Sequence, residues 1–152
     1  MYTLVLAVHS WLRWLALVAG IAATVTAMSD KSASSAPGRT DLWGLVLMML
    51  LDIQMLLGLL LYLVLSPFTT EAMRDFGAAM RNPGLRFFAV EHLALMLGAV
   101  VLAHVGRVLA RKATSPEAKR MRLMFSFGFA TILMLLGIPW PGLASGRPLF
   151  RI

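Results

Sequence analysis

Three histidines carry the clearest potential for chemistry in this chain: His9, His92 and His104. All three lie inside apolar runs, and the run "FAVEHLALMLGAVVLAHVGR" (residues 88–107) holds two of them together with Glu91. A neutral imidazole is a common ligand of metal ions and of haem iron. Because ionisable side chains are costly in hydrocarbon, their presence in such runs indicates that they bind something or fasten helices to one another.

The elements that must position these residues are long apolar blocks. Of the 152 residues, 59% are hydrophobic and 14% are charged, whereas about 25% of the residues of a soluble domain are charged. A helix that spans a bilayer needs about 20 apolar residues. Blocks that reach or approach this length cover residues 3–28, 42–65, 87–110 and 123–140. The sequence therefore predicts one all-α domain over residues 1–152, an integral membrane four-helix transmembrane bundle.

Several function classes are excluded by what the sequence lacks. Without cysteine the chain has no disulfide, thiolate metal site or iron–sulfur cluster. It also has no glycine-rich phosphate loop and no HExxH zinc motif. The net charge of +7 comes largely from short loops, which suits anionic lipid headgroups better than nucleic acid. So small a chain has little mass outside the bilayer for an active site, which favours a subunit of a larger complex or a homo-oligomer over an independent enzyme.

The distribution of basic residues predicts an orientation in a bacterial inner membrane. Four spans place both termini on one side and the first and third loops on the other. The first and third loops hold eight basic residues: Lys31, Arg39, Arg107, Arg111, Lys112, Lys119, Arg120 and Arg122. The second loop and the C-terminal tail hold five: Arg74, Arg81, Arg86, Arg147 and Arg151. Because basic loops stay in the cytoplasm, both termini are expected outside it.

The connections between the spans differ in character. Residues 66–86 predict a short interfacial helix between spans two and three, capped by Thr69 or Thr70, with Met73, Phe76 and Met80 as its apolar stripe. The sequence "NPG" (residues 82–84) is expected to stop this helix and turn the chain into span three. Residues 111–122 predict a tight basic turn, and the proline-containing tail after residue 138 is expected to lie along the outer surface.

His9 and His92 fall at a similar depth in their helices. At about 1.5 Å per residue, His9 lies roughly 9–10 Å and His92 roughly 8 Å below the same end of the bundle. Two imidazoles from different helices at one level are the ligand arrangement of haem b. The alternative is that both histidines only hydrogen-bond between helices. His104 lies roughly 18 Å deeper than His92, so it is the less favoured iron ligand.

Charged groups near these histidines complete the candidate site. An ion pair of Arg13 with Asp52 or with Glu91 would lower the cost of holding these charges in the membrane. If a haem binds at His9 and His92, its propionates can meet Arg13 or Arg86, of which Arg86 has the better depth. The predicted cofactor-binding residues are therefore His9, His92, Arg13 and Arg86, and no catalytic residue is predicted.

Five segments resemble a group of small bacterial four-helix membrane proteins labelled cytochrome b-like. They are "HSWLRW" (9–14), "IQMLLGLLLY" (53–62), "RFFAVEH" (86–92), "GRVLARKA" (106–113) and "IPWP…RP" (138–148). The resemblance covers nearly the whole chain and implies haem b and electron transfer, with His9 and His92 in the matching motifs. Some members of that group carry histidine where this chain has Asp52, so a ligand that a second haem would need is absent here.

The leading functional prediction is a membrane-bound b-type cytochrome-like subunit with one haem b between spans one and three. It would exchange electrons with a quinone or a partner redox subunit. A weaker resemblance, carried by a histidine near the start of span one followed by tryptophan, points to the membrane domain of the CopD copper-resistance group. Copper handling therefore stays open, because imidazole and thioether ligands suit Cu(I). A structural subunit without a cofactor is the third reading.

Overall fold

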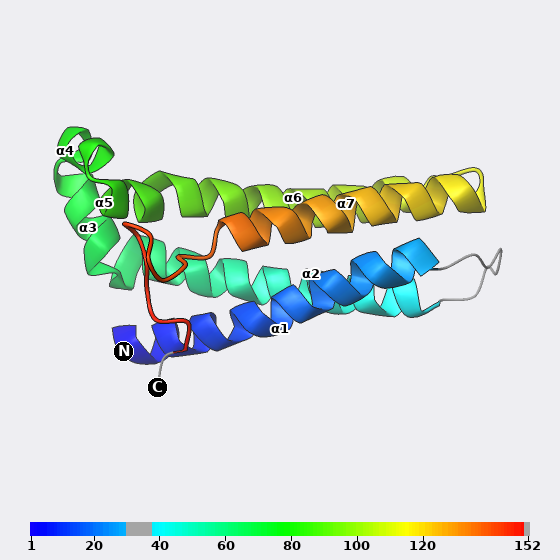
Figure 1. The fold of residues 1–152 in the computed structure, drawn as a ribbon, viewed down its shortest axis with the longest axis horizontal. Helices are drawn as coiled ribbons and strands as arrows, with labels where there is room; N and C mark the ends of the chain where they lie inside the picture. Colours follow the sequence, from blue (N-terminus) through cyan, green and yellow to red (C-terminus); the bar gives the residue numbers. More distant parts are fainter. Residues whose placement is uncertain (30–37, 151–152) are drawn as a thin grey trace.

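The computed structural model describes residues 1–29 and 38–150, and this part of the chain is built from helices without any β-strand. Its long helices are α1 (Tyr2–Ser29), α2 (Arg39–Leu60), α6 (His92–Arg111) and α7 (Pro116–Leu136). They run alongside one another over the length of the molecule (Figure 1). The prediction of an all-α fold is confirmed.

Three helical stretches are long and apolar enough to cross a bilayer: Tyr2–Ser29, Arg39–Leu65 and Pro83–Arg111. They correspond to the first three predicted spans. The predicted tight basic turn is shorter than residues 111–122. Helix α6 ends at Arg111 and α7 begins at Pro116, where Ser115 caps it by accepting the N–H of Ala118 at 3.1 Å. The first turns of α7 therefore carry charged side chains, and the fourth span over residues 123–140 remains a prediction.

Two short π-helical segments widen the second and third stretches. They are η1 (Leu61–Leu65), which follows α2, and η2 (Phe87–Glu91), which precedes α6. The hydroxyl of Tyr62 in η1 donates a hydrogen bond to the carbonyl of Ala89 in η2 at 2.8 Å. Such wide turns are frequent at functional sites. Here the hydrogen bond joins η1 to η2 directly before His92, and so it helps to position the start of α6.

Residues 66–86 form three short helices instead of the single interfacial helix that we expected. They are α3 (Pro67–Arg74), α4 (Phe76–Arg81) and α5 (Pro83–Arg86). The expected caps Thr69 and Thr70 are wrong, because Ser66 is the N-cap of α3. Asp75 separates α3 from α4 by accepting the N–H of Ala78 at 2.9 Å.

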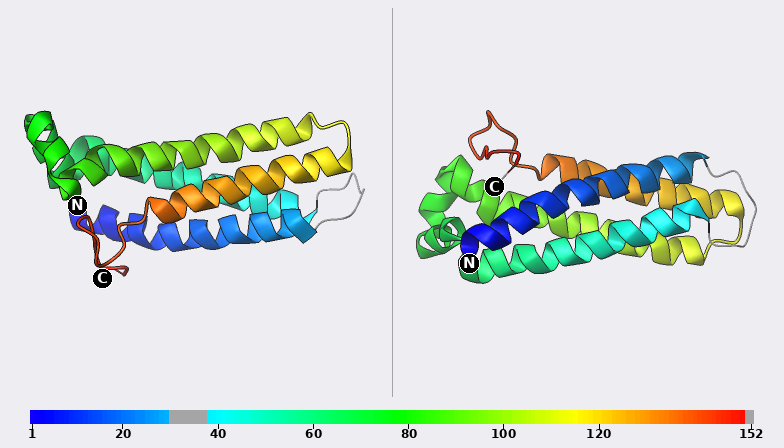
Figure 2. Two further views of the ribbon diagram at one scale, coloured as in Figure 1. Left: turned by 45° about the horizontal axis from the view of Figure 1, so that its top comes forward. Right: turned by 90° about the horizontal axis from the view of Figure 1, so that it is seen from below.

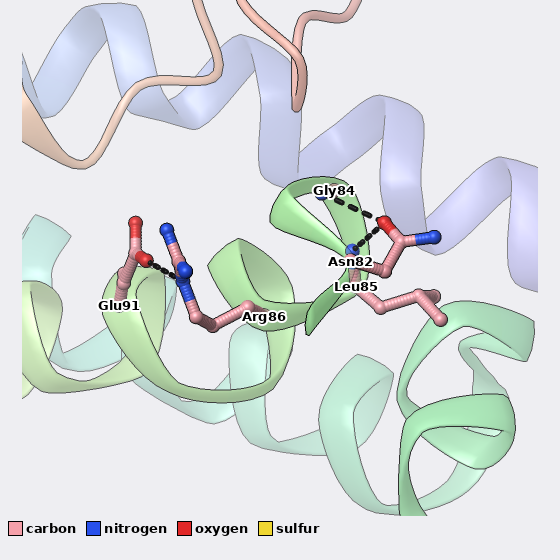
Figure 3. Close-up of polar contacts among 5 residues, drawn as sticks. All are labelled: Asn82, Gly84, Leu85, Arg86 and Glu91. Carbon is pink, nitrogen blue, oxygen red and sulfur yellow. Dashed lines mark hydrogen bonds and ion pairs between the residues drawn. The ribbon is translucent and has the colours of Figure 1, made fainter. Parts of the chain in front are cut away.

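The segment "NPG" begins a helix as well as ending one. The side chain of Asn82 accepts the N–H groups of Gly84 at 3.0 Å and Leu85 at 3.2 Å (Figure 3). Pro83 occupies the first turn of α5, where its missing N–H costs nothing. Helix α5 then continues through η2 into α6, so the third stretch starts at residue 83.

The helices pack in a ring in which α1 and α6 are diagonal to each other. Both α1 and α6 pack against α2 and against α7. Small side chains allow close packing away from the short helices, as in many membrane helix pairs. A Cβ atom at Gly20 of α1, for example, would lie 2.5 Å from the Oγ1 atom of Thr131 in α7. The buried alanines of α1 and α6 are Ala16, Ala19, Ala23, Ala27, Ala99, Ala103 and Ala110.

One end of the bundle is covered by two segments, residues 66–86 and residues 137–150, which we call the cap. After α7 the chain crosses this end and reaches α1 (Figures 1 and 2). The carbonyl of Leu149 accepts hydrogen bonds from Arg13 at 2.7 Å and from the indole of Trp14 at 3.2 Å. The ring of Phe150 stacks on that of Trp14, with the ring centres 5.6 Å apart. The tail is therefore a structural part of the bundle end.

Candidate functional site

His9 and His92 meet inside the capped end of the bundle. Their ring centres lie 6.3 Å apart and their ring planes are inclined at 67°. His9 comes from α1, and His92 is the first residue of α6. Because these helices are diagonal to each other, the two rings face one another across the bundle instead of lying on neighbouring surfaces.

A cavity of about 140 Å³ adjoins both histidines. Its walls come from α1, α2, α6, the end of α7 and the cap, and most of the lining side chains are apolar or aromatic. A single water needs roughly 10–15 Å³ of such space. The volume of the cavity is therefore larger than that of an ordinary packing defect, and it could accommodate a molecule larger than water.

His92 is oriented by the end of α7. Its Nδ1 atom lies 2.7 Å from the carbonyl oxygen of Gly137. A carbonyl can only accept a hydrogen bond, so this contact requires the proton on Nδ1 and leaves the lone pair of a neutral ring on Nε2. Metal-ligating histidines usually hold their second ring nitrogen in this way, which fixes both the tautomer and the ring orientation.

His9 has polar capacity that the protein does not use. Within residues 1–29 and 38–150, its buried Nδ1 atom has no hydrogen-bond partner, and the same holds for Oε1 of Gln54. Both residues line the cavity. Gly58 of α2 faces His9, since a Cβ atom at this glycine would lie 3.4 Å from Cε1 of the imidazole. Buried polar atoms without partners are rare in proteins, so these two atoms are candidate contacts for a molecule in the cavity.

Two arginines line the cavity, and only one of them was expected there from the sequence. Arg13 of α1 was expected at the site, whereas Arg147 comes from the cap. The guanidinium of Arg147 lies over the rings of Phe68 and Phe88, at 4.5 Å and 5.1 Å from their centres. Nothing in the local sequence marks Arg147, because only the path of the tail across the bundle end brings it there.

Arg86, the other predicted cationic partner, lies away from the cavity. Its Nε atom is 2.6 Å from Oε1 of Glu91, and both side chains are exposed (Figure 3). Arg86 is not among the residues that line the cavity. The structure therefore brings together His9, His92 and Arg13 from the predicted set and places Arg147 beside them.

The expected ion pairs of Arg13 with Asp52 or Glu91 are wrong. Asp52 pairs with His104, whose Nε2 atom is 3.4 Å from the carboxylate, and Glu91 pairs with Arg86. Asp52 and Gln54 lie on different sides of α2, so Gln54 reaches the cavity and Asp52 is exposed. His104 lies outside the cavity, in a separate polar pair.

Comparisons with protein-family models, with curated proteins and with solved structures found no match to this chain. The resemblances to the cytochrome b-like group and to the CopD group therefore stay predictions.

Proposed function

We propose that this chain is a membrane-bound b-type cytochrome-like subunit that holds one haem b between His9 and His92. The spacing of the two rings carries the proposal. A metal ion lies about 2.0–2.1 Å from an imidazole nitrogen, so two histidines that share one ion must have their rings close together. The ring centres of His9 and His92 lie 6.3 Å apart, which is compatible with a shared ion.

His9 and His92 would hold the iron of a haem, and their surroundings suit that role. The contact of His92 with Gly137 leaves Nε2 of His92 available as a ligand atom. The buried Nδ1 atom of His9 and Oε1 of Gln54 are polar groups that a bound ligand can rearrange or satisfy. Gly58 provides space beside His9 where a side chain would fill the cavity. These features support a planar group held between α1 and α6.

The cavity, at about 140 Å³, is smaller than the roughly 300–1,000 Å³ of typical ligand pockets, so α1 and α6 would have to separate around a haem. The lining otherwise has the chemistry of a haem pocket. Haem b, when bound, provides the one-electron chemistry. The apolar walls exclude water and lower the local dielectric. Arg13 and Arg147 bring positive charge to the cavity, which suits the two carboxylates of a haem. His9 lies on α1 and His92 on α6, so the packing of these helices determines the relative position of the two imidazole rings.

The setting of this function is a bacterial inner membrane, with four spans and both termini outside the cytoplasm. Three stretches of suitable length and composition support the insertion. An electron would pass between the haem and a quinone or a partner redox subunit. The chain would then act as a subunit of a complex or of a homo-oligomer and not as an enzyme by itself.

Copper handling is the second candidate, and one observation favours it. Met55, Met96 and Met134 line the same cavity as the two histidines. Imidazole and thioether groups together are suitable ligands for Cu(I). A purely structural role accounts for the bond between His92 and Gly137 and for the contact of His9 with the backbone of Gln54. It leaves the Nδ1 atom of His9 without a partner among the described residues.

The experiment that separates these candidates is a measurement of haem and copper per chain. The protein is purified in detergent from cells grown with sufficient haem precursor and copper. The proposal predicts about one haem per chain, lost in His9→Ala and in His92→Ala but retained in His104→Ala. Copper without haem would establish the second candidate, and the absence of both would leave the structural role.

A further inference from the structure

Asp52 and His104 form a polar pair on the outside of the bundle. The two side chains are 52% and 37% exposed, and Nε2 of His104 lies 3.4 Å from Oδ1 of Asp52. Asp52 has 13 residues on either side within the stretch Arg39–Leu65, so it lies at the middle of a candidate span. In the proposed membrane setting, this pair faces the hydrocarbon, where ionisable groups seldom point without a partner.

We propose that a second copy of this chain covers the Asp52–His104 pair and that the chain forms a two-fold symmetric dimer through α2 and α6. The inference rests on the membrane insertion of the proposed function and does not depend on haem. The pair is only loosely joined within one copy. A distance of 3.4 Å exceeds the usual 2.7–3.2 Å of a hydrogen bond. Within residues 1–29 and 38–150, the carboxylate of Asp52 has no other polar partner.

The surfaces around the pair have the spacing of a helix–helix seam. Helices that pack along their length present residues at alternating steps of three and four. Asp52 on α2 and His104 on α6 each lie in a row of exposed residues with this spacing. The other members of the rows are apolar: Leu45, Met49 and Leu56 on α2, and Leu97, Val101 and Val108 on α6. A single polar residue in an apolar seam fixes the register and the number of strands.

The chemistry of the pair identifies a second copy as the occupant. Nδ1 of His104 lies 2.9 Å from the carbonyl of Val100 and therefore carries a proton. The other ring nitrogen, Nε2, faces the carboxylate of Asp52. One face thus contains an imidazole, which can donate a hydrogen bond, and a carboxylate, which can accept one. A two-fold axis would place Asp52 of each copy beside His104 of the other, so that the interface complements itself.

Cross-linking provides a direct test, because the chain has no cysteine. A single cysteine is introduced by Met49→Cys in the proposed seam or, as a control, by Val18→Cys on α1. Val18 is 58% exposed and lies at a similar distance from the end opposite the cap. Membranes are treated with a short bis-maleimide. Covalent dimers are expected for Met49→Cys and not for Val18→Cys.

The role of the polar pair is tested in the Met49→Cys background. Replacing both groups, Asp52→Leu with His104→Leu, should lower the dimer fraction about tenfold, since interhelical polar contacts are lost. The thermal unfolding midpoint of the double variant shows that the bundle still folds, and His104→Leu alone provides a milder second variant with the same expected direction.

Four results would overturn the dimer. Two concern the site of cross-linking: dimers from Val18→Cys instead of Met49→Cys, or a product of Met49→Cys that contains only a different polypeptide. The third is a dimer fraction that the replacement of Asp52 and His104 does not change. The fourth is a monomer in every sample. Recovery of the wild-type chain outside the membrane fraction would instead remove the insertion on which both proposals rest. A cross-linked dimer without haem would support this inference while contradicting the cytochrome proposal.

Discussion

The carbonyl oxygen of Gly137, at the end of α7, lies 2.7 Å from Nδ1 of His92, at the start of α6. The last carbonyls of a helix have no partner within that helix. Here one of them orients a histidine of the neighbouring helix, so α7 contributes to the site without supplying a histidine of its own. Gly137 is also the first residue of the cap segment 137–150. The same residue therefore orients His92 and connects α7 to the cap.

Loss of the hydrogen bond between Tyr62 and Ala89 should destabilise the end of the bundle that contains the site. Tyr62→Phe removes the donor that ties η1 to η2. The net contribution of such a bond is about 1 kcal/mol, which corresponds to a thermal midpoint lower by roughly 2–4 °C. Tyr2→Phe is the matched control, because no hydrogen bond of the Tyr2 hydroxyl is found within the described residues. Equal midpoints for both variants would show that the link contributes nothing.

Close packing of α1 on α7 should make Gly20 intolerant of a side chain. In Gly20→Ala the new Cβ atom would lie 2.5 Å from Oγ1 of Thr131, so either Thr131 changes rotamer and loses its bond to Phe127 or the helices move apart. Overpacking of this kind costs about 1–3 kcal/mol. Gly128→Ala is the control, since its Cβ atom would meet Cγ2 of Thr24 at an ordinary 3.6 Å. Alanine there should be neutral or stabilise the helix by up to about 1 kcal/mol.

Thermal unfolding in detergent measures both glycine variants. The packing argument requires the midpoint of Gly20→Ala to fall below that of Gly128→Ala. The reverse order would mean that α1 and α7 can separate at this level without cost.

Arg147 should bind the carboxylates of the haem in the proposed site. Arg147→Gln is expected to weaken haem binding about tenfold, as removal of a charge-assisted hydrogen bond does. Binding is followed by titration of purified apoprotein with haem and, in parallel, with haem dimethyl ester, which has no carboxylates. The ester should bind wild type and variant equally, because the lost interaction requires a negative charge.

The ester also separates a charge effect from damage to the cap, where Arg147 packs on Phe68 and Phe88. Equal weakening of haem and ester would assign Arg147 a structural role only. Arg86→Gln is the matched control, since Arg86 lies outside the cavity and pairs with Glu91. It should leave both affinities unchanged.

The sequence was sufficient to predict the helical fold and the depth of the two histidines. Apolar blocks predict where helices run, and helical rise places His9 and His92 at one level, where the structure brings their rings together. The partners of charged residues were not predictable in the same way. The pairing of Asp52 with His104 in place of Arg13 depends on how α2 is rotated against α6, and helical rise contains no information about that rotation.

The cap was the least predictable region. Ser66, Asp75 and Asn82 each start a helix, so three short helices replace the expected one. Several candidate capping residues compete in so polar a segment, and local propensity does not decide among them. Arg147 was missed because its place at the cavity results from the tertiary path of the tail across the bundle end.

The central claim is that His9 and His92 ligate one haem, and a reduced-minus-oxidised absorption spectrum tests it most directly. Purified wild-type protein should show a sharpened, shifted Soret band and a resolved α band after dithionite, as six-coordinate haem b does. His9→Ala and His92→Ala should lose this signature, whereas His104→Ala should keep it. A featureless wild-type spectrum from haem-sufficient cells, or a signature that survives both cavity substitutions, would contradict the account.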